Sequence, residues 1–128
     1  GEARDATGNR TAEETKGESM SNVITVSNEE EYKKALSEVK GAVALEFTAV
    51  GCPACDEEIP EVDALSKTCG GLTIIRADAD ALSALADSFK CDATPTIYFA
   101  KKAVDLVPGK ALELEDSAAL KKKMKCAR

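Results

Sequence analysis

Two cysteines separated by two residues, Cys52 and Cys55, are the side chains of this sequence best suited to chemistry. This spacing is typical either of a dithiol/disulfide couple or of half a zinc site. A structural zinc site needs four ligands, whereas the other cysteines stand singly and the chain has no histidine. The sequence therefore favours a redox pair and predicts no metal site.

The pair stands where a predicted strand gives way to a predicted helix. Residues 42–48 form a nearly continuous apolar run, as in a strand buried on both faces. Pro53 suits the first turn of a helix, where no N–H is needed. Cys52 then becomes the N-cap, and the free N–H groups and the helix dipole lower the pKa of its thiol. We predict that Cys52 is the exposed nucleophile and that Cys55 resolves the mixed disulfide with the substrate.

One carboxylate, Glu46, interrupts the apolar run before the cysteine pair. Burial raises the pKa of a lone carboxyl, which suits a group that takes the proton of Cys55, directly or through water, when that thiol attacks. An alternative is a structural ion pair with Arg76 on the neighbouring strand, and the two roles can coexist. Because the chain has no histidine, cysteine and carboxylate must carry the chemistry.

The elements that position these residues alternate between strand and helix patterns. Strands are predicted at residues 23–26, 42–48, 72–77, 96–100 and 103–107, the last two as a hairpin across Lys101 and Lys102. Helices are predicted from a Ser27/Glu30 capping box to Gly41, from Cys52 to Gly70, over residues 81–89 with Asp80 as the cap, and from Asp116 onward. This order implies an α/β fold in which about four helices flank a central mixed β-sheet of about five strands.

The start of the chain has a different composition. Residues 1–19 contain no Val, Ile, Leu or aromatic residue, so they cannot bury enough apolar area to offset the entropy of ordering them. We predict a disordered N-terminal tail or artificial leader over residues 1–20 and a single folded domain over residues 21–128. If residues 1–19 are native, they are interpreted as a processed pro-segment.

The charge balance limits the partners. The chain has 17 basic and 23 acidic residues, a formal net charge of −6, and such a field repels the phosphates of nucleic acids. No apolar run approaches the roughly 20 residues of a membrane-spanning helix. We expect a monomer with no nucleic-acid or membrane partner. Its expected compartment is the cytoplasm, or an organelle or the cell exterior if residues 1–19 are a processed segment.

The segment Cys52-Pro53-Ala54-Cys55 resembles the redox motif of the thioredoxin superfamily. Pro60 falls where thioredoxins kink the following helix, and Thr94-Pro95-Thr96 is similar to the family's cis-proline segment, which faces the redox pair. Glu46 stands at the place of the family's buried aspartate, and Arg76 stands where thioredoxins carry a lysine.

This resemblance covers about residues 22–126 and implies the thioredoxin fold. It also implies a thiol–disulfide oxidoreductase that reduces or exchanges protein disulfides through the Cys52–Cys55 couple, with no further cofactor. The implied partners are disulfide-containing proteins and a reductase, such as thioredoxin reductase or another dithiol donor. By the same resemblance, the residues expected to contact the substrate are Gly51, Pro53, Ala54, Thr94, Pro95 and Gly109.

The motif also departs from the family. Thioredoxins usually place Trp before the first cysteine and Gly-Pro between the two, where this chain has Gly51 and Pro53-Ala54. Cys-Pro-x-Cys is also the pattern of glutaredoxins, tryparedoxins and periplasmic oxidants, and a more stabilised thiolate makes a more oxidising couple. Two alternatives stay open: a glutathione-dependent reductase, and a non-catalytic binding module whose affinity the cysteine pair switches.

Four acids crowd the opening turns of the second predicted helix: Asp56, Glu57, Glu58 and Glu61. They favour the helix but repel a negative charge on Cys52. We therefore expect the pKa of the Cys52 thiol to be lowered only moderately, with a potential less reducing than that of a typical thioredoxin. Cys91 is expected to be a small core residue, and Cys69 and Cys126 are expected to be free thiols.

Overall fold

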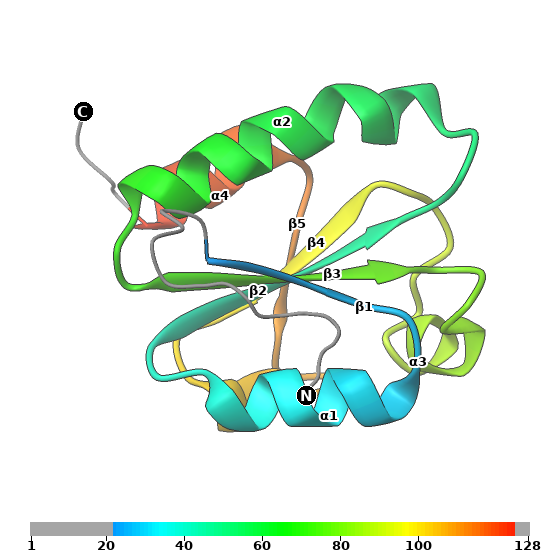
Figure 1. Ribbon diagram of the computed structural model, residues 1–128, viewed down its shortest axis with the longest axis horizontal. Helices are drawn as coiled ribbons and strands as arrows, with labels where there is room; N and C mark the ends of the chain where they lie inside the picture. Colours follow the sequence, from blue (N-terminus) through cyan, green and yellow to red (C-terminus); the bar gives the residue numbers. More distant parts are fainter. Residues whose placement is uncertain (1–21, 125–128) are drawn as a thin grey trace, which may run out of the picture.

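The computed structural model describes residues 22–124. The strands are β1 (Val23–Val26), β2 (Ala42–Thr48), β3 (Leu72–Asp78), β4 (Thr96–Ala100) and β5 (Leu112–Leu114). The helices are α1 (Glu29–Glu38), α2 (Pro53–Thr68), α3 (Ser83–Ser88) and α4 (Ser117–Met124), with a 3₁₀ turn, η1 (Ala103–Asp105). Helices α2 and α4 cover one face of the sheet, and α1 and α3 cover the other (Figure 1).

The sheet has the strand order β1-β3-β2-β4-β5. The central strand β2 pairs parallel with β3 and antiparallel with β4. At the edges, β1 pairs parallel with β3 and β5 pairs antiparallel with β4. The predicted α/β fold, a mixed sheet of five strands flanked by four helices, is therefore confirmed for the described residues.

Successive side chains of β2 point to opposite faces of the sheet. Val43, Leu45 and Phe47 enter the core beneath α1 and α3, whereas Ala44 packs in the core beneath α2 and α4. All four side chains are wholly buried, which explains why β2 is almost entirely apolar. Glu46 shares the face of Ala44 and therefore points toward α2, the helix that begins at the cysteine pair.

The start of α1 differs by one residue from the predicted cap. Asn28 is the N-cap, and its Oδ1 accepts a hydrogen bond from the Glu31 N–H at 2.8 Å. The Glu31 carboxylate in turn accepts from the N–H and the hydroxyl of Ser27, at 2.8 and 3.0 Å. The predicted Ser27/Glu30 box is wrong by one position, because Asn28 is an equally good cap and stands one residue nearer the helix.

The second strand of the predicted hairpin is also wrong. Residues Ala103–Asp105 form η1, and the chain pairs with β4 only later, at β5. Val104 is 76% exposed, so its apolar side chain does not mark a buried strand face. A turn at Gly109, with φ of +90°, precedes β5, where Leu114 is buried opposite Ile97. A run as short as residues 103–107 has too few alternating positions to separate strand from turn.

The remaining differences lie at helix α3 and at the chain ends. Leu82 is the N-cap of α3 and makes no side-chain cap. The expected cap, Asp80, lies instead in a turn where the Asp78 carboxylate accepts hydrogen bonds from the N–H groups of Asp80 and Ala81, at 2.8 and 3.3 Å. The predicted tail over residues 1–20 and Cys126 lie outside the described residues.

Candidate redox site

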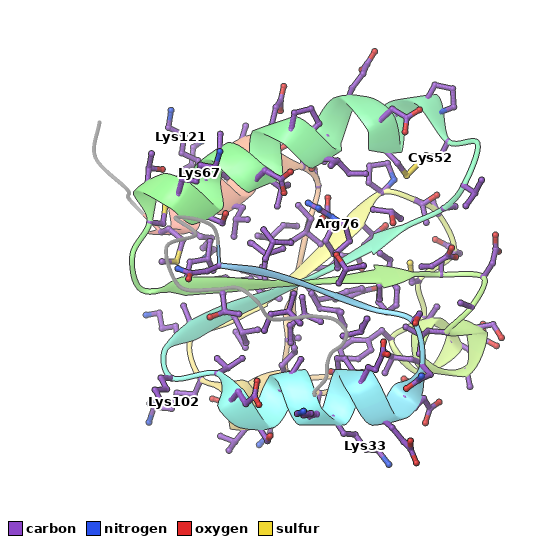
Figure 2. All side chains as sticks on the ribbon, in the orientation of Figure 1. Lys33, Cys52, Lys67, Arg76, Lys102 and Lys121 are labelled. Carbon is purple, nitrogen blue, oxygen red and sulfur yellow. A yellow bond between two sulfur atoms is a disulfide. The ribbon has the colours of Figure 1, made fainter. Side chains whose placement is uncertain are left out.

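Cys52 and Cys55 form a disulfide at the start of α2 (Figure 2). Cys52 is the N-cap and Pro53 occupies the first turn, as predicted. The Cys55 N–H donates a hydrogen bond to the Cys52 Sγ at 3.1 Å. Cys52 is partly exposed, whereas Cys55 is wholly buried. An incoming molecule therefore reaches the Cys52 sulfur first.

A second chain segment closes over this sulfur. The Thr94–Pro95 peptide bond is cis, as the resemblance implies. The Thr94 hydroxyl donates to the Cys52 Sγ across 3.6 Å, and the Thr94 carbonyl oxygen lies 3.7 Å from the same sulfur. The Thr96 hydroxyl donates to the carbonyl of Ala93 at 2.6 Å and holds the loop together. The fold thus brings Thr94, distant in sequence, into contact with the redox pair.

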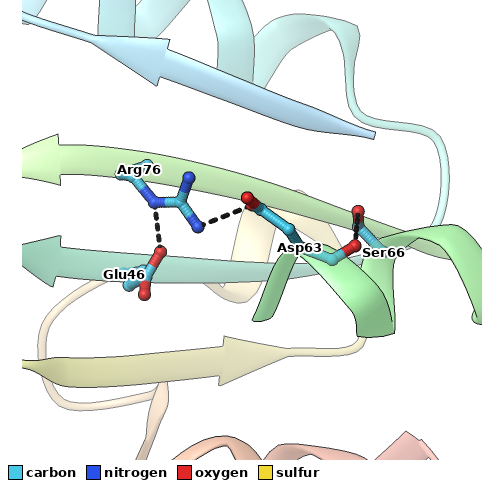
Figure 3. Close-up of polar contacts among 4 residues, drawn as sticks. All are labelled: Glu46, Asp63, Ser66 and Arg76. Atoms are coloured by element: carbon cyan, nitrogen blue, oxygen red, sulfur yellow. Dashed lines mark hydrogen bonds and ion pairs between the residues drawn. The ribbon is translucent and has the colours of Figure 1, made fainter. Parts of the chain in front are cut away.

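Beneath the pair, Glu46 belongs to a chain of charged groups (Figure 3). The Arg76 Nε donates to Glu46 Oε1 at 2.6 Å, and the Arg76 Nη2 donates to Asp63 Oδ1 at 2.9 Å. Glu46 and Arg76 are partners in the register of β2 and β3, so the sheet itself holds them together. Ser66 adds a hydrogen bond to the Asp63 carbonyl at 2.7 Å.

The pKa of the Glu46 carboxyl stays above its ordinary value in spite of this ion pair. Burial is the largest cause and raises the pKa of the Glu46 carboxyl, while the charge and the hydrogen bond of Arg76 oppose that rise. Of the two Glu46 carboxylate oxygens, Arg76 contacts only Oε1. The other oxygen, Oε2, is buried and has no hydrogen-bond partner among the described residues. The ion pair with Arg76 is therefore confirmed at Oε1 and leaves Oε2 of the same side chain without a partner among the described residues.

Glu58, one of the four acids in the opening turns of α2, is buried. In the structure it is only 9% exposed, and its Oε2 has no hydrogen-bond partner within residues 22–124. Burial raises the pKa of the Glu58 carboxyl most, and the charge of Glu46 raises it next. The helical spacing of Cys55, Glu58, Val62 and Leu65 places all four on the buried face. The spacing is visible in the sequence, but the charge of Glu58 removes the apolar signal by which a buried face is recognised.

The other predicted contact residues surround the pair unevenly. Gly51 (φ +76°), Pro53 and Ala54 are exposed next to the sulfurs. Gly109 is exposed in the turn before β5, and within residues 22–124 no hydrogen bond joins it to either cysteine. Val50, which the sequence analysis did not single out, is 87% exposed directly beside the motif.

A groove of about 330 Å³ adjoins the redox site at Thr94. Small side chains and three carboxylates line it, namely Asp80, Asp87 and Asp92, and its lining contains no basic residue. Cys91 is also in its wall; it is a free, half-buried thiol that packs against the core, and its Sγ donates to the Ala93 carbonyl at 3.2 Å. Burial raises the pKa of the Cys91 thiol.

Cys69 departs from its expected state. It is buried in the core beneath α2 and α4, and it is disulfide-bonded, so the expectation of a free thiol is wrong for Cys69. Within the described residues no group of three or more His, Cys, Asp or Glu side chains is placed to hold a metal ion. None of the helices described between residues 22 and 124 has the length and apolarity needed to cross a membrane.

A disulfide of this spacing at the start of a helix, fed by a buried central strand and faced by a cis-proline loop, defines a dithiol oxidoreductase of the thioredoxin fold. The thioredoxin family model matches residues 23–126, and the chain belongs to the thioredoxin family. It is accordingly an oxidoreductase of protein disulfides, whose redox group is its own disulfide and whose partners are disulfide proteins and a reductase.

Individual relatives agree with the family. The chain is 35% identical over 78 residues to thioredoxin H3 of Arabidopsis thaliana, covering 61% of this chain and 66% of that protein. It is 35% identical over 93 residues to an H-type thioredoxin of Picea mariana, covering 69% and 74%. Oxidized thioredoxin O1 of A. thaliana has a similar structure, with a TM-score of 0.66 at 28% identity over 81% of this chain and 96% of that chain. NaTrxh of Nicotiana alata, at 23% identity, has a TM-score of 0.68 over 84% and 95% and supports the fold.

Proposed function

We propose that Cys52 is the nucleophile that attacks a substrate disulfide and that Cys55 resolves the mixed disulfide. The observation that carries this proposal is the Cys52–Cys55 disulfide at the start of α2, with one sulfur partly exposed and the other buried. A protein substrate reaches only Cys52 from outside. Cys55 then reacts from within, where no second substrate competes.

The proposed reaction balances without a further cofactor. The Cys52 thiolate attacks one substrate sulfur, a mixed disulfide forms, and the other substrate sulfur leaves as a thiolate that takes a proton from water. The Cys55 thiolate next attacks the Cys52 sulfur. The Cys52–Cys55 bond forms, the bond to the substrate breaks, and the second substrate sulfur leaves as a thiolate that also takes a proton. The substrate is then a dithiol that has gained two electrons.

Glu46 is the proposed acceptor of the Cys55 proton, directly or through water. Its buried position and its raised pKa make it a stronger base than a surface carboxylate. Arg76 holds one carboxylate oxygen, and the other oxygen has no partner within the described residues. The ion pair thus orients the carboxylate and leaves one oxygen available for the proton.

We propose that the substrate chain binds the exposed surface around Cys52. The contacts assigned by the family resemblance are Gly51, Pro53, Ala54, Thr94, Pro95 and Gly109. Gly51 stands where other thioredoxins carry Trp, and Val50 offers an exposed apolar contact next to it. Because the flat apolar surface of Trp is missing, we expect a substrate set different from that of a general thioredoxin.

The finer assignments complete the proposal. We propose thioredoxin reductase with NADPH as the electron donor, a monomeric domain over residues 21–128, and the cytoplasm as the compartment. Similarity to H-type thioredoxins supports the reductase. A reducing compartment supports the direction of the reaction, because a dithiol reductant needs a pool of electrons at lower potential.

Insulin reduction tests the proposal. We expect turnover when NADPH and thioredoxin reductase are supplied, loss of turnover in Cys52→Ser, and a trapped mixed disulfide in Cys55→Ser. Cys91→Ser is the matched control and should keep full turnover, because Cys91 is not part of the pair. Turnover with glutathione alone would assign the protein to the glutathione-dependent class. Turnover by neither route would favour a binding module that the cysteine pair switches.

A further inference from the structure

A second buried carboxyl, Glu58, has no place in the steps described so far. We propose that Glu58 and Glu46 form a buried pair that shares the proton taken from Cys55, so that Glu58 acts through Glu46 to set the pH at which Cys55 is deprotonated. This inference rests on the proposed roles of Cys55 and Glu46 and adds a positioning residue to them.

Both carboxyls lie in the layer between α2 and the sheet. Glu46 projects from β2 on the face covered by α2 and is wholly buried. Glu58 stands one turn after Cys55 on the buried face of α2, which Val62 continues, and is 9% exposed. The two acids thus converge on the interior next to the resolving cysteine, one from the sheet and one from the helix.

Each acid keeps one buried oxygen without a hydrogen-bond partner among the described residues, Glu46 Oε2 and Glu58 Oε2. A buried and unpartnered carboxylate oxygen is unfavourable, because it has left water without gaining a donor. A bound proton changes one carboxyl into a donor while the other remains an acceptor. One proton shared between the two carboxyls therefore supplies the hydrogen bond that each buried oxygen lacks.

The charges around Glu46 favour its ionised form. Arg76 donates to Glu46 Oε1 at 2.6 Å, and the second contact of Arg76, to Asp63 at 2.9 Å, fixes the guanidinium in place. Asp63 is partly exposed and adds a smaller, opposing effect on the pKa of Glu46. With Arg76 in contact, Glu46 can pass on a proton and return to its ionised state.

The charges around Glu58 favour its protonated form. No ion pair of Glu58 occurs within residues 22–124. The negative charges of Glu46, Asp116 and Glu61 all raise the pKa of the Glu58 carboxyl, and only the Ser117 N–H acts in the opposite direction. A proton accepted by the pair therefore rests mainly on Glu58.

The balance of the Cys55 step is unchanged by this addition. The S–H proton of Cys55 passes to ionised Glu46, directly or through water, and then to Glu58. The Cys55 thiolate forms its bond to the Cys52 sulfur while the bond from Cys52 to the substrate breaks, and the substrate leaves as a thiolate. The pair returns the proton to that thiolate or to water. The charge of ionised Glu46 raises the proton affinity of Glu58, so the proton passes from Glu46, whose ionised form Arg76 stabilises, to Glu58.

Carboxyl titration tests the pair directly. The side-chain ¹³C signals of Glu46 and Glu58 are followed from pH 4 to pH 9 in the oxidised protein. We expect Glu46→Gln to move the Glu58 titration to lower pH, because the charge of ionised Glu46 raises the pKa of the Glu58 carboxyl. The matched control is Glu57→Gln, which removes the same charge from an exposed neighbour on α2. If Glu46→Gln moves the Glu58 titration no further than Glu57→Gln does, the pair is overturned.

A kinetic measurement separates this inference from the proposed function. Single-turnover reduction of a peptide disulfide by the fully reduced protein is recorded from pH 5 to pH 9. We expect Glu58→Gln to shift the acid limb of the rate profile to lower pH, and Glu57→Gln to leave it in place. If the two carboxyls titrate as a pair but Glu58→Gln leaves the acid limb of the rate profile in place, the role of Glu46 as proton acceptor is overturned. The role of Glu58, which acts through Glu46, is then overturned as well. Unlinked titrations would overturn the pair alone, because insulin reduction tests Cys52 and Cys55 separately.

Discussion

The Cys52 sulfur lies among hydrogen-bond donors. The Cys55 N–H is 3.1 Å away, the Thr94 hydroxyl is 3.6 Å away, and the start of α2 adds its positive dipole. The opposing charges of Asp56 and Glu57 are exposed to solvent, where water and salt screen them. Contacts within hydrogen-bond distance outweigh screened charges, so the donors decide the acidity of this thiol.

We expect the pKa of the Cys52 thiol to lie below about 8.5, the ordinary value for cysteine. Thr94→Val should raise it, because the variant keeps the shape of the side chain and removes the hydroxyl donor. The measurement is the iodoacetamide alkylation rate of the Cys52 peptide against pH, followed by mass spectrometry. Thr25→Val, on the edge strand β1, is the control. A wild-type midpoint at or above about 8.5 would contradict the prediction.

Glu58 also predicts how stability depends on pH. Its pKa is raised by burial, so between the ordinary carboxyl pKa of about 4.3 and the raised value the native state binds more protons than the unfolded state. Stability therefore falls as pH rises through that window and stays lower above it. Gln has no charge to bury, so Glu58→Gln should be more stable than wild type at pH 8, on the order of 1 kcal/mol, and nearly equal at pH 4.

Urea unfolding of the oxidised protein at the two pH values checks this expectation. Glu57→Gln is the control, because Glu57 is exposed on the same helix. It should leave the difference between pH 4 and pH 8 as it is in the wild type. Equal unfolding free energies for wild type and Glu58→Gln at both pH values would mean that burial of Glu58 carries no cost.

Among the elements, the loops before β2 and β3 approach each other closely. A Cβ on Gly41 would lie 2.8 Å from the Gly71 carbonyl oxygen, and that oxygen accepts the Ala42 N–H at 3.0 Å. The neighbouring atom is backbone and lies directly before β3, so it has little freedom to move. The start of the central strand pair therefore depends on the absence of a side chain at Gly41.

Gly41→Ala should destabilise the protein by about 1 to 3 kcal/mol, the usual range for forcing an extra carbon into a filled space. Gly70→Ala is the matched control, because nothing lies within 4 Å of its Cβ position, and loss of a glycine there reduces the entropy of the unfolded chain. Thermal and urea unfolding measure both variants. Equal effects of the two substitutions would show that the contact at Gly71 yields without cost.

The helix that carries the redox pair shows what periodicity reveals and what it conceals. The strand before it and Pro53 were enough to predict where α2 begins and that Cys52 caps it. The same helical period places Glu58 on the buried face, yet a charged residue removes the apolar signal by which that face is recognised. The burial of Glu58 depends on the face of β2 that packs against α2, and the spacing of residues along one helix carries no information about that face.

On the scale of the whole molecule, the strand and helix order followed from the sequence because each long element has a clear period. The ion pair between Glu46 and Arg76 was also predictable, since both residues interrupt apolar strands that become neighbours. The position of β5 was not predictable, because three residues at a sheet edge carry almost no pattern. The cis bond at Pro95 came from family resemblance alone, since cis is the minority state of such bonds.

The distribution of charge predicts which disulfides the protein prefers. Asp80, Asp87 and Asp92 line the groove beside Thr94, with no basic residue among its lining, and the net charge of −6 adds to their field. A peptide disulfide flanked by Lys should be reduced up to about tenfold faster, in kcat/KM at low salt, than one flanked by Glu. Added salt should reduce the ratio of kcat/KM for the Lys-flanked peptide to that for the Glu-flanked peptide, because it screens the carboxylates. The double variant Asp87→Asn/Asp92→Asn should reduce the same ratio. The control Glu38→Gln/Glu115→Gln removes two exposed charges outside the groove and should preserve the preference. Equal rates for the two peptides at low salt would show that the groove does not select by charge.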